Sequence, residues 1–160
     1  MVSRSARSSP SACDAAVRAV VQRAHGASVS VAGERISGFD GPGLVVLAGV
    51  THDDGPDQVE WLARKIAQLR ILRDERSAQD EGAPVLLISQ FTLYADTRKG
   101  RRPSWNGAAP GPVAEPLVAD LGRALAAYGL PVHEGVFGAD MAVQFTNDGP
   151  VTIILDTATP

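Results

Sequence analysis

Apolar residues alternate with polar ones in several stretches of the chain, the first of which begins at residue 17. Val17, Ala19 and Val21 alternate with Arg18 and Gln22, and residues 28–31 repeat the pattern. Successive side chains of a β-strand point to opposite faces of the sheet. The alternation therefore predicts antiparallel strands that are buried on one face.

Two further stretches, residues 44–50 and 85–88, are apolar without interruption. Such runs are typical of strands covered on both faces, so we expect them at the centre of the sheet. The second run leads directly into the polar segment Ser89-Gln90-Phe91-Thr92. Any chemistry on this strand should therefore lie at its carboxyl end.

The period of the pattern changes in two places. Apolar residues recur every three or four positions in residues 56–72 and again in residues 115–128, which predicts two amphipathic helices. We expect Asp54 to cap the first helix. The second should begin at Pro116 and end before Gly129, because proline favours the first helical turn and glycine the position after the last.

Near the C-terminus, alternation resumes at residues 141–146 and 151–155, on either side of Asn147-Asp148-Gly149-Pro150. This predicts a β-hairpin with the tetrapeptide as its turn. With six or more strands and two helices, we expect an α+β fold, with a mainly antiparallel, barrel-like sheet in a single domain over residues 17–158. Residues 1–16 are rich in Ser, Ala and Arg and are interpreted as a disordered extension, with a transit peptide or a misassigned start as alternatives.

Composition narrows the function classes. Of the 160 residues, 44% are hydrophobic and 21% charged, as a compact domain requires. The net charge of -3 gives no global attraction to nucleic acid, so an RNA contact would need a local patch. Cys13 is the single cysteine and the three histidines are far apart, so we expect no disulfide, metal or cofactor. No apolar run reaches the roughly 18 residues of a membrane span, which favours a cytoplasmic protein without membrane contact.

Two segments carry candidate chemistry. The hydroxyls, amide and backbone of Ser89-Gln90-Phe91-Thr92 could hydrogen-bond an ester carbonyl and its developing oxyanion, or merely terminate a strand. No G-x-S-x-G elbow surrounds Ser89, so a triad-type nucleophile is not indicated. A cationic run follows, which is either a solvated loop or a phosphate-binding loop. Its members are Arg98, Lys99, Arg101 and Arg102.

Six segments taken together closely resemble the D-aminoacyl-tRNA deacylases, over almost the whole chain after residue 16. Two of them are long motifs in the right order and spacing, which makes the resemblance highly specific. The six are Val17–Arg23, Gly49–Asp54, Ser89–Thr97, Gly100–Ser104, Phe137–Met141 and Asn147–Thr152.

The resemblance implies a homodimer with active sites at the subunit interface, where Ser89–Thr92 of one subunit faces Gly149-Pro150 of the other. In this family the Gly-Pro bond is cis, and its carbonyls exclude an L side chain from the pocket. Glycyl-tRNA, which has no side chain to exclude, would be a second substrate. The resemblance further implies that the 2′-hydroxyl of the terminal adenosine assists hydrolysis, while the enzyme, with Thr92 in a positioning role, holds the ester.

Residues 74–83 depart from the family pattern, which has Met-Asn and then a serine-containing stretch. Ser77 could correspond to that serine, but no role is transferred to it. Two other hypotheses remain open from the residues themselves. One is a non-catalytic tRNA-binding module that uses the cationic run, and the other is an esterase with Ser89 or Thr92 as its nucleophile.

Overall fold

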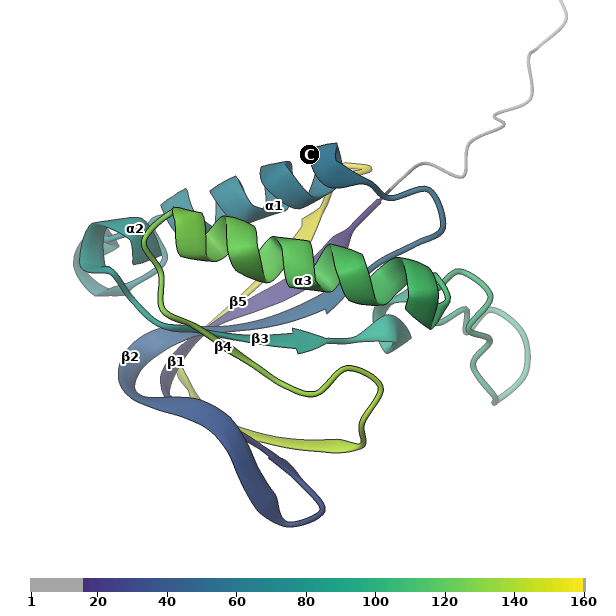
Figure 1. The fold of residues 1–160 in the computed structure, drawn as a ribbon, viewed down its shortest axis with the longest axis horizontal. Coiled ribbons are helices and arrows are strands. Elements are labelled where there is room, and N and C mark those ends of the chain that lie inside the picture. The colour runs from purple at the N-terminus through teal and green to yellow at the C-terminus, as the bar shows by residue number, and fades with distance from the viewer. Residues whose placement is uncertain (1–15, 160) are drawn as a thin grey trace, which may run out of the picture.

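The computed structural model describes residues 16–159, which form one five-stranded sheet with helices packed on one face (Figure 1). The strand order is β4-β3-β2-β1-β5. The α+β prediction is confirmed, with a sheet that is antiparallel at β2-β1-β5 and parallel at β4-β3-β2. The strands are β1 (Arg18–Val31), β2 (Glu34–Gly49), β3 (Val85–Ser89), β4 (Val132–Glu134) and β5 (Met141–Asp156).

The described residues form five strands instead of the six or more predicted, because segments that were predicted as separate strands belong to one continuous strand. Residues 18–22 and 28–31 belong to the single strand β1, which has a register shift between His25 and Ala27. The far halves of β1, β2 and β5 form an arm that curls away from the helices (Figure 1). A second apolar cluster includes Val29 and Phe39 of this arm. The curl bends the sheet, whose edge strands are β4 and β5.

The predicted C-terminal hairpin is wrong. Both of its halves lie in β5, and both pair with β1, since Ala24 is opposite Asn147 and Gln22 is opposite Thr152. Residues 148–151 therefore bulge out opposite the single residue Arg23. Alternation has the same period in a strand that turns back and in one that continues past a bulge, so the pattern could not distinguish them.

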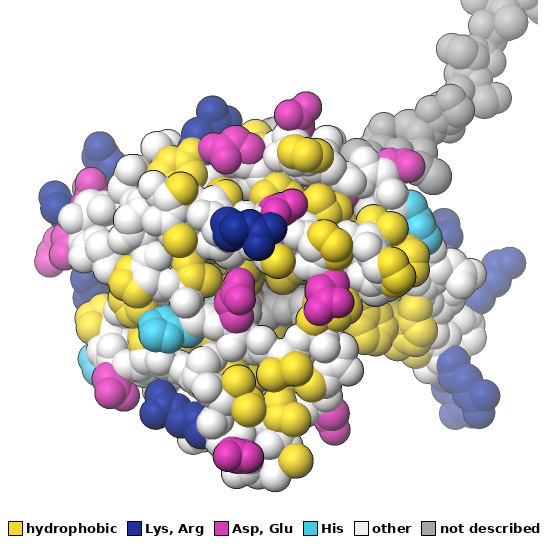
Figure 2. Space-filling model, viewed as in Figure 1, with side chains coloured by type: hydrophobic (Ala, Val, Ile, Leu, Met, Phe, Trp, Pro, Cys, Tyr) yellow, Lys and Arg dark blue, Asp and Glu magenta, His cyan; other side chains and the backbone are white. Residues whose placement is uncertain are grey.

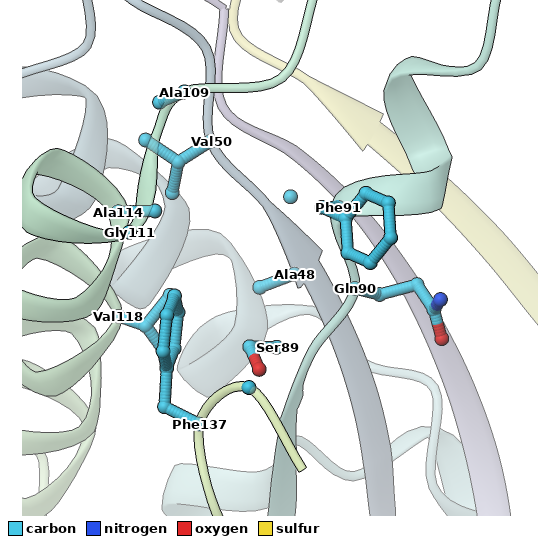
Figure 3. A pocket seen from close by; sticks show the side chains of 12 residues that line it. Ala48, Val50, Ser89, Gln90, Phe91, Ala109, Gly111, Ala114, Val118 and Phe137 are labelled. Carbon is cyan, nitrogen blue, oxygen red and sulfur yellow. The ribbon is translucent and has the colours of Figure 1, made fainter. Parts of the chain in front are cut away.

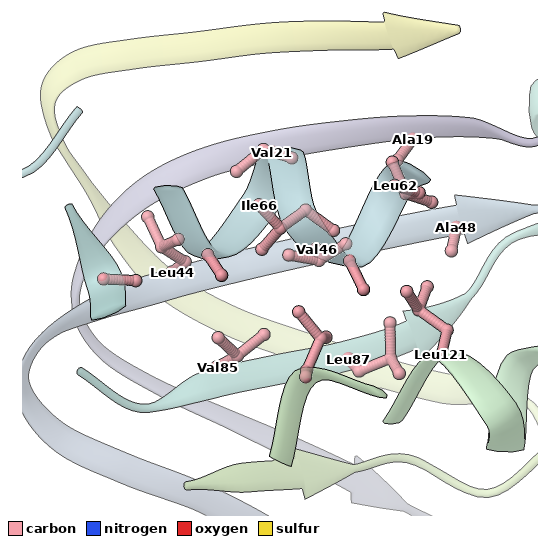
Figure 4. Close-up of a cluster of buried hydrophobic side chains, with 14 of the residues drawn as sticks. Ala19, Val21, Leu44, Val46, Ala48, Leu62, Ile66, Val85, Leu87 and Leu121 are labelled. Carbon is pink, nitrogen blue, oxygen red and sulfur yellow. The ribbon is translucent and has the colours of Figure 1, made fainter. Parts of the chain in front are cut away.

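Two long helices, α1 (Pro56–Gln68) and α3 (Gly111–Ala127), cover the other face of the sheet (Figure 1). Both were predicted, whereas the short α2 (Ala78–Glu81) and the 3-10 turns η1 (Arg73–Glu75) and η2 (Phe91–Tyr94) were not. Figure 4 shows apolar side chains of α1 and α3 interleaved with those of the sheet. The contacts join Leu62 and Ile66 of α1 and Leu121 of α3 to Val21, Val46 and Leu87.

The predicted helix starts need correction. Asp54 does not cap α1; the N-cap is Gly55, whose N–H donates to the Gln58 side chain at 2.9 Å. The carboxylate of Asp54 instead accepts from the Thr51 N–H at 2.7 Å. Helix α3 begins at Gly111, one turn before the predicted start, and Pro116 lies inside it. A second proline, Pro112, takes the place in the first turn that was assigned to Pro116.

The predicted extension of residues 1–16 lies outside the described residues except for Ala16. That residue and Val17 are both buried, so packing reaches at least to position 16. Within residues 16–159 there is no helix with the length and apolar character needed to cross a membrane.

Candidate active site

A small pocket of about 200 Å³ lies where the parallel strands β2 and β3 end, beside the first turns of α3 (Figure 3). The strand ends supply one wall, the helix a second, and the loop before β5 a third. The lining residues are Ala48, Gly49, Val50, Ser89, Gln90, Phe91, Ala109, Gly111, Ala114, Val118, Phe137 and Gly138.

The end of β2 fits against the segment after β3 because it carries small residues. A Cβ on Gly49 would lie 2.9 Å from the Gln90 carbonyl oxygen and 3.2 Å from Leu93 Cβ, so only glycine permits this approach. Ser89 supplies the one hydroxyl among the lining side chains. In Figure 3 that hydroxyl faces the cavity near Phe137, whereas the Gln90 amide points away from it. Ser89 is therefore the polar side chain within an otherwise apolar pocket.

The predicted segment Ser89–Thr92 stays together, but its members take different places. The backbone N–H of Gln90 donates to the Ala48 carbonyl at 2.7 Å, which extends the sheet by one residue before η2 begins. The Gln90 amide donates to the Thr92 hydroxyl. Ser89, Gln90 and Phe91 line the pocket, and Thr92 does not. Thr92 and the Gln90 amide thus form a polar pair beside the pocket.

Arg18 anchors η2 to the sheet. Its guanidinium donates to the Leu93 carbonyl at 3.0 Å and to the Asp156 carboxylate at 2.9 Å, and it lies 4.8 Å from the centre of the Tyr94 ring. Burial raises the pKa of the Tyr94 hydroxyl well above its ordinary value. Tyr94 therefore stays neutral at physiological pH and serves as a packing surface under η2.

The cationic run lies on an exposed loop after η2, and its members differ in pairing. Arg98 donates to both carboxylate oxygens of Asp96, at 2.9 and 2.6 Å, and these hydrogen bonds lower the pKa of Asp96 to about 2. Within residues 16–159, Lys99, Arg101 and Arg102 make no ion pair. These three cations keep their charge uncompensated.

Gly149-Pro150 lies in the middle of β5, on the far side of β1 and β2 from Ser89, so one chain does not bring the two predicted site segments together. In the strand pairing, Ser89 lies beside Ala48 of β2. Arg23, which faces the bulge, lies across β2 from Val85, the first residue of β3. The separation is roughly 13 Å along the strands and roughly 14 Å across three strand spacings. The Gly149-Pro150 peptide bond is cis.

Two arginines hold the bulge at Asp148. Arg23 Nε donates to the Asp148 carbonyl at 2.9 Å, and Arg73 donates to both Asp148 carboxylate oxygens at 2.6 and 3.1 Å. The Arg73 hydrogen bonds lower the pKa of the Asp148 carboxyl. The same three residues line a second cavity, of about 440 Å³, between the bulge and residues 72–84.

Sequence reasoning identified the segment after β3 but missed several residues around it. Phe137 was noticed as part of a motif without a role, and Ala109 and Gly111 gave no signal, since small residues in a loop are common. Arg73 was missed because its partner is 75 positions away. In the described part of the chain, no group of three or more His, Cys, Asp or Glu side chains is placed to hold a metal ion.

Comparison with known proteins agrees with this architecture. A family model described as D-Tyr-tRNA(Tyr) deacylase matches residues 20–156. A protein named D-aminoacyl-tRNA deacylase from Kineococcus radiotolerans is 69% identical over 140 residues, which cover 88% of this chain and 99% of that protein.

Two solved structures share the fold. One, titled c-Myc DNA Unwinding Element Binding Protein, is 39% identical with a TM-score of 0.80, covering 86% of this chain and 97% of that one. The other, a probable eukaryotic D-amino acid tRNA deacylase, has a TM-score of 0.75 at 14% identity, covering 88% and 99%, and supports the fold alone. From the family match and the high identity to a full-length relative, the chain belongs to the D-Tyr-tRNA(Tyr) deacylase family.

Proposed function

We propose that this chain hydrolyses the ester bond of D-aminoacyl-tRNA, releasing a free D-amino acid and a tRNA that can be charged again. Its family and its 69% identical relative, named D-aminoacyl-tRNA deacylase, support this activity. The observation that carries it furthest is the small apolar pocket with Ser89 as its inward-facing hydroxyl. Because aminoacyl-tRNA is used in translation, the cytoplasm is the proposed location.

The pocket suits positioning of an ester better than attack on it. Within the described residues no histidine hydrogen-bonds Ser89, and His52 instead contacts the Asn106 carbonyl at 2.9 Å. Ser89 therefore lacks the histidine partner that activates the serine of a catalytic triad. The first N–H groups of a helix have no intrahelical partner, so those of Phe91 and Thr92 are available to an oxyanion. We assign the nucleophilic assistance to the 2′-hydroxyl of the terminal adenosine.

A homodimer is part of the proposal, because β1 and β2 separate Ser89 from Gly149-Pro150 within one chain. A second copy could bring its own bulge to this pocket. The edge strand β5 offers a surface for such pairing, since within residues 16–159 it pairs with β1 only and Ile154 is 70% exposed.

In that arrangement Gly149-Pro150 would exclude L-amino acids by shape. Backbone carbonyls placed where an L side chain must go would produce a steric clash, and a clash of about 4 kcal/mol separates the enantiomers by roughly a thousandfold. A D side chain points elsewhere and is accepted. Glycine has no side chain to exclude, so glycyl-tRNA is a proposed secondary substrate.

Initial rates with D-tyrosyl-, L-tyrosyl- and glycyl-tRNA test the activity and its selectivity. We expect turnover of the first and third, and a rate on L-tyrosyl-tRNA that is lower by roughly a thousandfold. Equal hydrolysis of both enantiomers, or of neither, would overturn the proposal. A D-tyrosyl-tRNA that ends in 2′-deoxyadenosine should react far more slowly, and an unchanged rate would favour a side-chain nucleophile.

Two other functions are tested by the same protein. One is nucleic-acid binding without catalysis, because one of the similar solved structures is named as a DNA-binding protein. Tight tRNA binding with no ester turnover would favour it. An esterase with a Ser89 or Thr92 nucleophile is the other, and it should cleave small activated esters and react with serine-directed phosphonates. The deacylase proposal predicts inertness to both reagents.

A further inference from the structure

Two large aromatic side chains are exposed beside the mouth of the pocket. Phe91 is 56% exposed and Trp105 is 42% exposed, and their rings meet edge to face with centroids 5.3 Å apart. Phe91 lines the pocket, and in Figure 3 its ring stands at the side farthest from α3. A stable pair of rings that faces solvent offers a stacking surface for a planar ligand.

The uncompensated cations lie on the loop that leads into this aromatic pair. Asp96 and Ser104 join the base of the loop through two backbone hydrogen bonds of 2.8 and 2.9 Å, and Trp105 follows directly. Figure 2 shows Lys and Arg side chains projecting at this end of the molecule. All four cations of the loop are exposed, but Arg98 is paired with Asp96, whereas Lys99, Arg101 and Arg102 make no ion pair within residues 16–159.

We propose that Phe91 and Trp105 stack on the base of the nucleotide preceding the terminal adenosine of aminoacyl-tRNA, and that Lys99, Arg101 and Arg102 contact phosphates farther along the strand. The inference rests on the proposed function, which puts the ester in the pocket. The RNA must then leave through the pocket mouth, past Phe91. Aromatic rings followed by uncompensated cations are the combination that binds single-stranded nucleic acid without base specificity.

The chain provides its own fluorescence test, because it has two tryptophans and Trp61 lies on α1 beside Lys65. In W61F the remaining tryptophan is Trp105, and excitation at wavelengths that only tryptophan absorbs reports on it alone. We expect deacylated tRNA with an intact CCA end to quench this fluorescence, and the same tRNA lacking its last two nucleotides not to quench it. The matched variant W105F should show no quenching with either RNA. Intact tRNA that binds W61F by anisotropy without quenching, or that does not bind, would overturn the proposal.

Kinetics supply a second measurement. The ratio of kcat/KM for D-tyrosyl-tRNA to that for D-tyrosyl-adenosine should fall roughly tenfold in W105A, because one stacking contact is lost from the longer substrate only. W61F should keep the wild-type ratio. An unchanged ratio in W105A contradicts the stacking site. A changed oligomeric state of W105A in sedimentation would also contradict it, by identifying the aromatic pair as a subunit contact.

These outcomes separate the inference from the function on which it rests. If the wild-type protein hydrolyses no D-aminoacyl-tRNA, the proposed function fails, yet quenching of Trp105 by intact tRNA would still establish the stacking site. If D-tyrosyl-tRNA is hydrolysed and Trp105 is not quenched, the function stands and the stacking site is excluded.

Discussion

Arg73 binds Asp148 through two parallel hydrogen bonds, from its terminal nitrogen to Oδ1 at 2.6 Å and from Nε to Oδ2 at 3.1 Å. This contact joins the turn η1 to the bulge that carries Gly149-Pro150. Such a two-point contact fixes orientation as well as distance. Asp148 directly precedes Gly149, so Arg73 is placed to hold Gly149-Pro150, the proposed selectivity element, in position.

Removing this contact should loosen chiral discrimination more than catalysis. In R73A we expect the ratio of D-tyrosyl- to L-tyrosyl-tRNA hydrolysis to fall several-fold, through a faster reaction with the L substrate, while kcat for the D substrate changes little. R73K should recover only part of the ratio, since an ammonium group lacks the planar fork of arginine. Single-turnover rates with both enantiomers measure the effect.

Arg76 provides the matched control for Arg73. It lines the same cavity but pairs with Glu81 at 2.7 Å and does not contact Asp148. R76A should therefore keep the wild-type ratio of the two enantiomers. Equal losses of selectivity in R73A and R76A would show that the cavity's general charge matters, and the specific Arg73–Asp148 contact would then have no separate role.

Gly149→Ala tests whether the bulge needs glycine. A Cβ at this position would lie 2.7 Å from the Arg23 guanidinium and 3.0 Å from a Val151 methyl, and φ is +130°. Gly33 has φ of +80° with open space around it, so G33A carries the backbone cost without the clash. G33A should lose about 1 kcal/mol of unfolding free energy, and G149A should lose more because it adds the clash. Only G149A should lose selectivity for the D substrate, and preserved selectivity in G149A would contradict the proposed role.

Ser89→Ala distinguishes a positioning hydroxyl from a nucleophile. Loss of one hydrogen-bond donor to a transition state lowers kcat by roughly 10² to 10³, whereas loss of a catalytic serine lowers it by about 10⁶. We expect the smaller loss, and the remaining activity should still require the 2′-hydroxyl of the substrate. Complete inactivation of a folded S89A, checked by circular dichroism, would instead support the nucleophilic serine.

The pattern of apolar residues in the sequence predicted the helices and strands whose buried faces repeat at regular intervals. The stripes of α1 and α3 and the apolar runs of β2 and β3 are recovered, because burial on one or both faces is written into consecutive residues. The start of α3 was misplaced, since Pro112 and Pro116 both satisfy the preference for proline near a helix start. The bulge at residues 148–151 was misread as a turn because only pairing with β1 distinguishes the two.

The candidate site was predictable only in part for a similar reason. Ser89 was found because polar residues follow an apolar run at a strand end. The contacts of Arg23 and Arg73 with Asp148 span 125 and 75 positions, and nothing near either arginine marks it as different from a surface residue. Separation of Ser89 from Gly149-Pro150 within one chain likewise follows from strand register, which alternation alone does not give.

Asp54 offers a test of how burial near the pocket affects stability. One carboxylate oxygen accepts from the Thr51 N–H, while Oδ1 is buried without a hydrogen-bond partner, as is the Tyr94 hydroxyl. Burial is the main cause that raises the pKa of Asp54 above its ordinary value of 3.8. The folded chain thus binds this proton more tightly than the unfolded chain. Unfolding free energy must then fall as pH rises from 3.8 through the folded pKa, and stay lower above it.

We therefore expect D54N to have a higher Tm than the wild type at neutral pH. Asparagine keeps an oxygen for the Thr51 N–H and removes the buried charge. The gain should shrink as pH falls through the raised pKa of Asp54 towards 3.8, because the wild-type carboxyl then becomes neutral in the folded chain. Thermal unfolding of both proteins across this range measures it, and D53N, at the exposed neighbouring position, should leave Tm unchanged. A lower Tm for D54N at neutral pH would mean that the charged form of Asp54 is stabilised by the fold, contrary to the direction argued from burial.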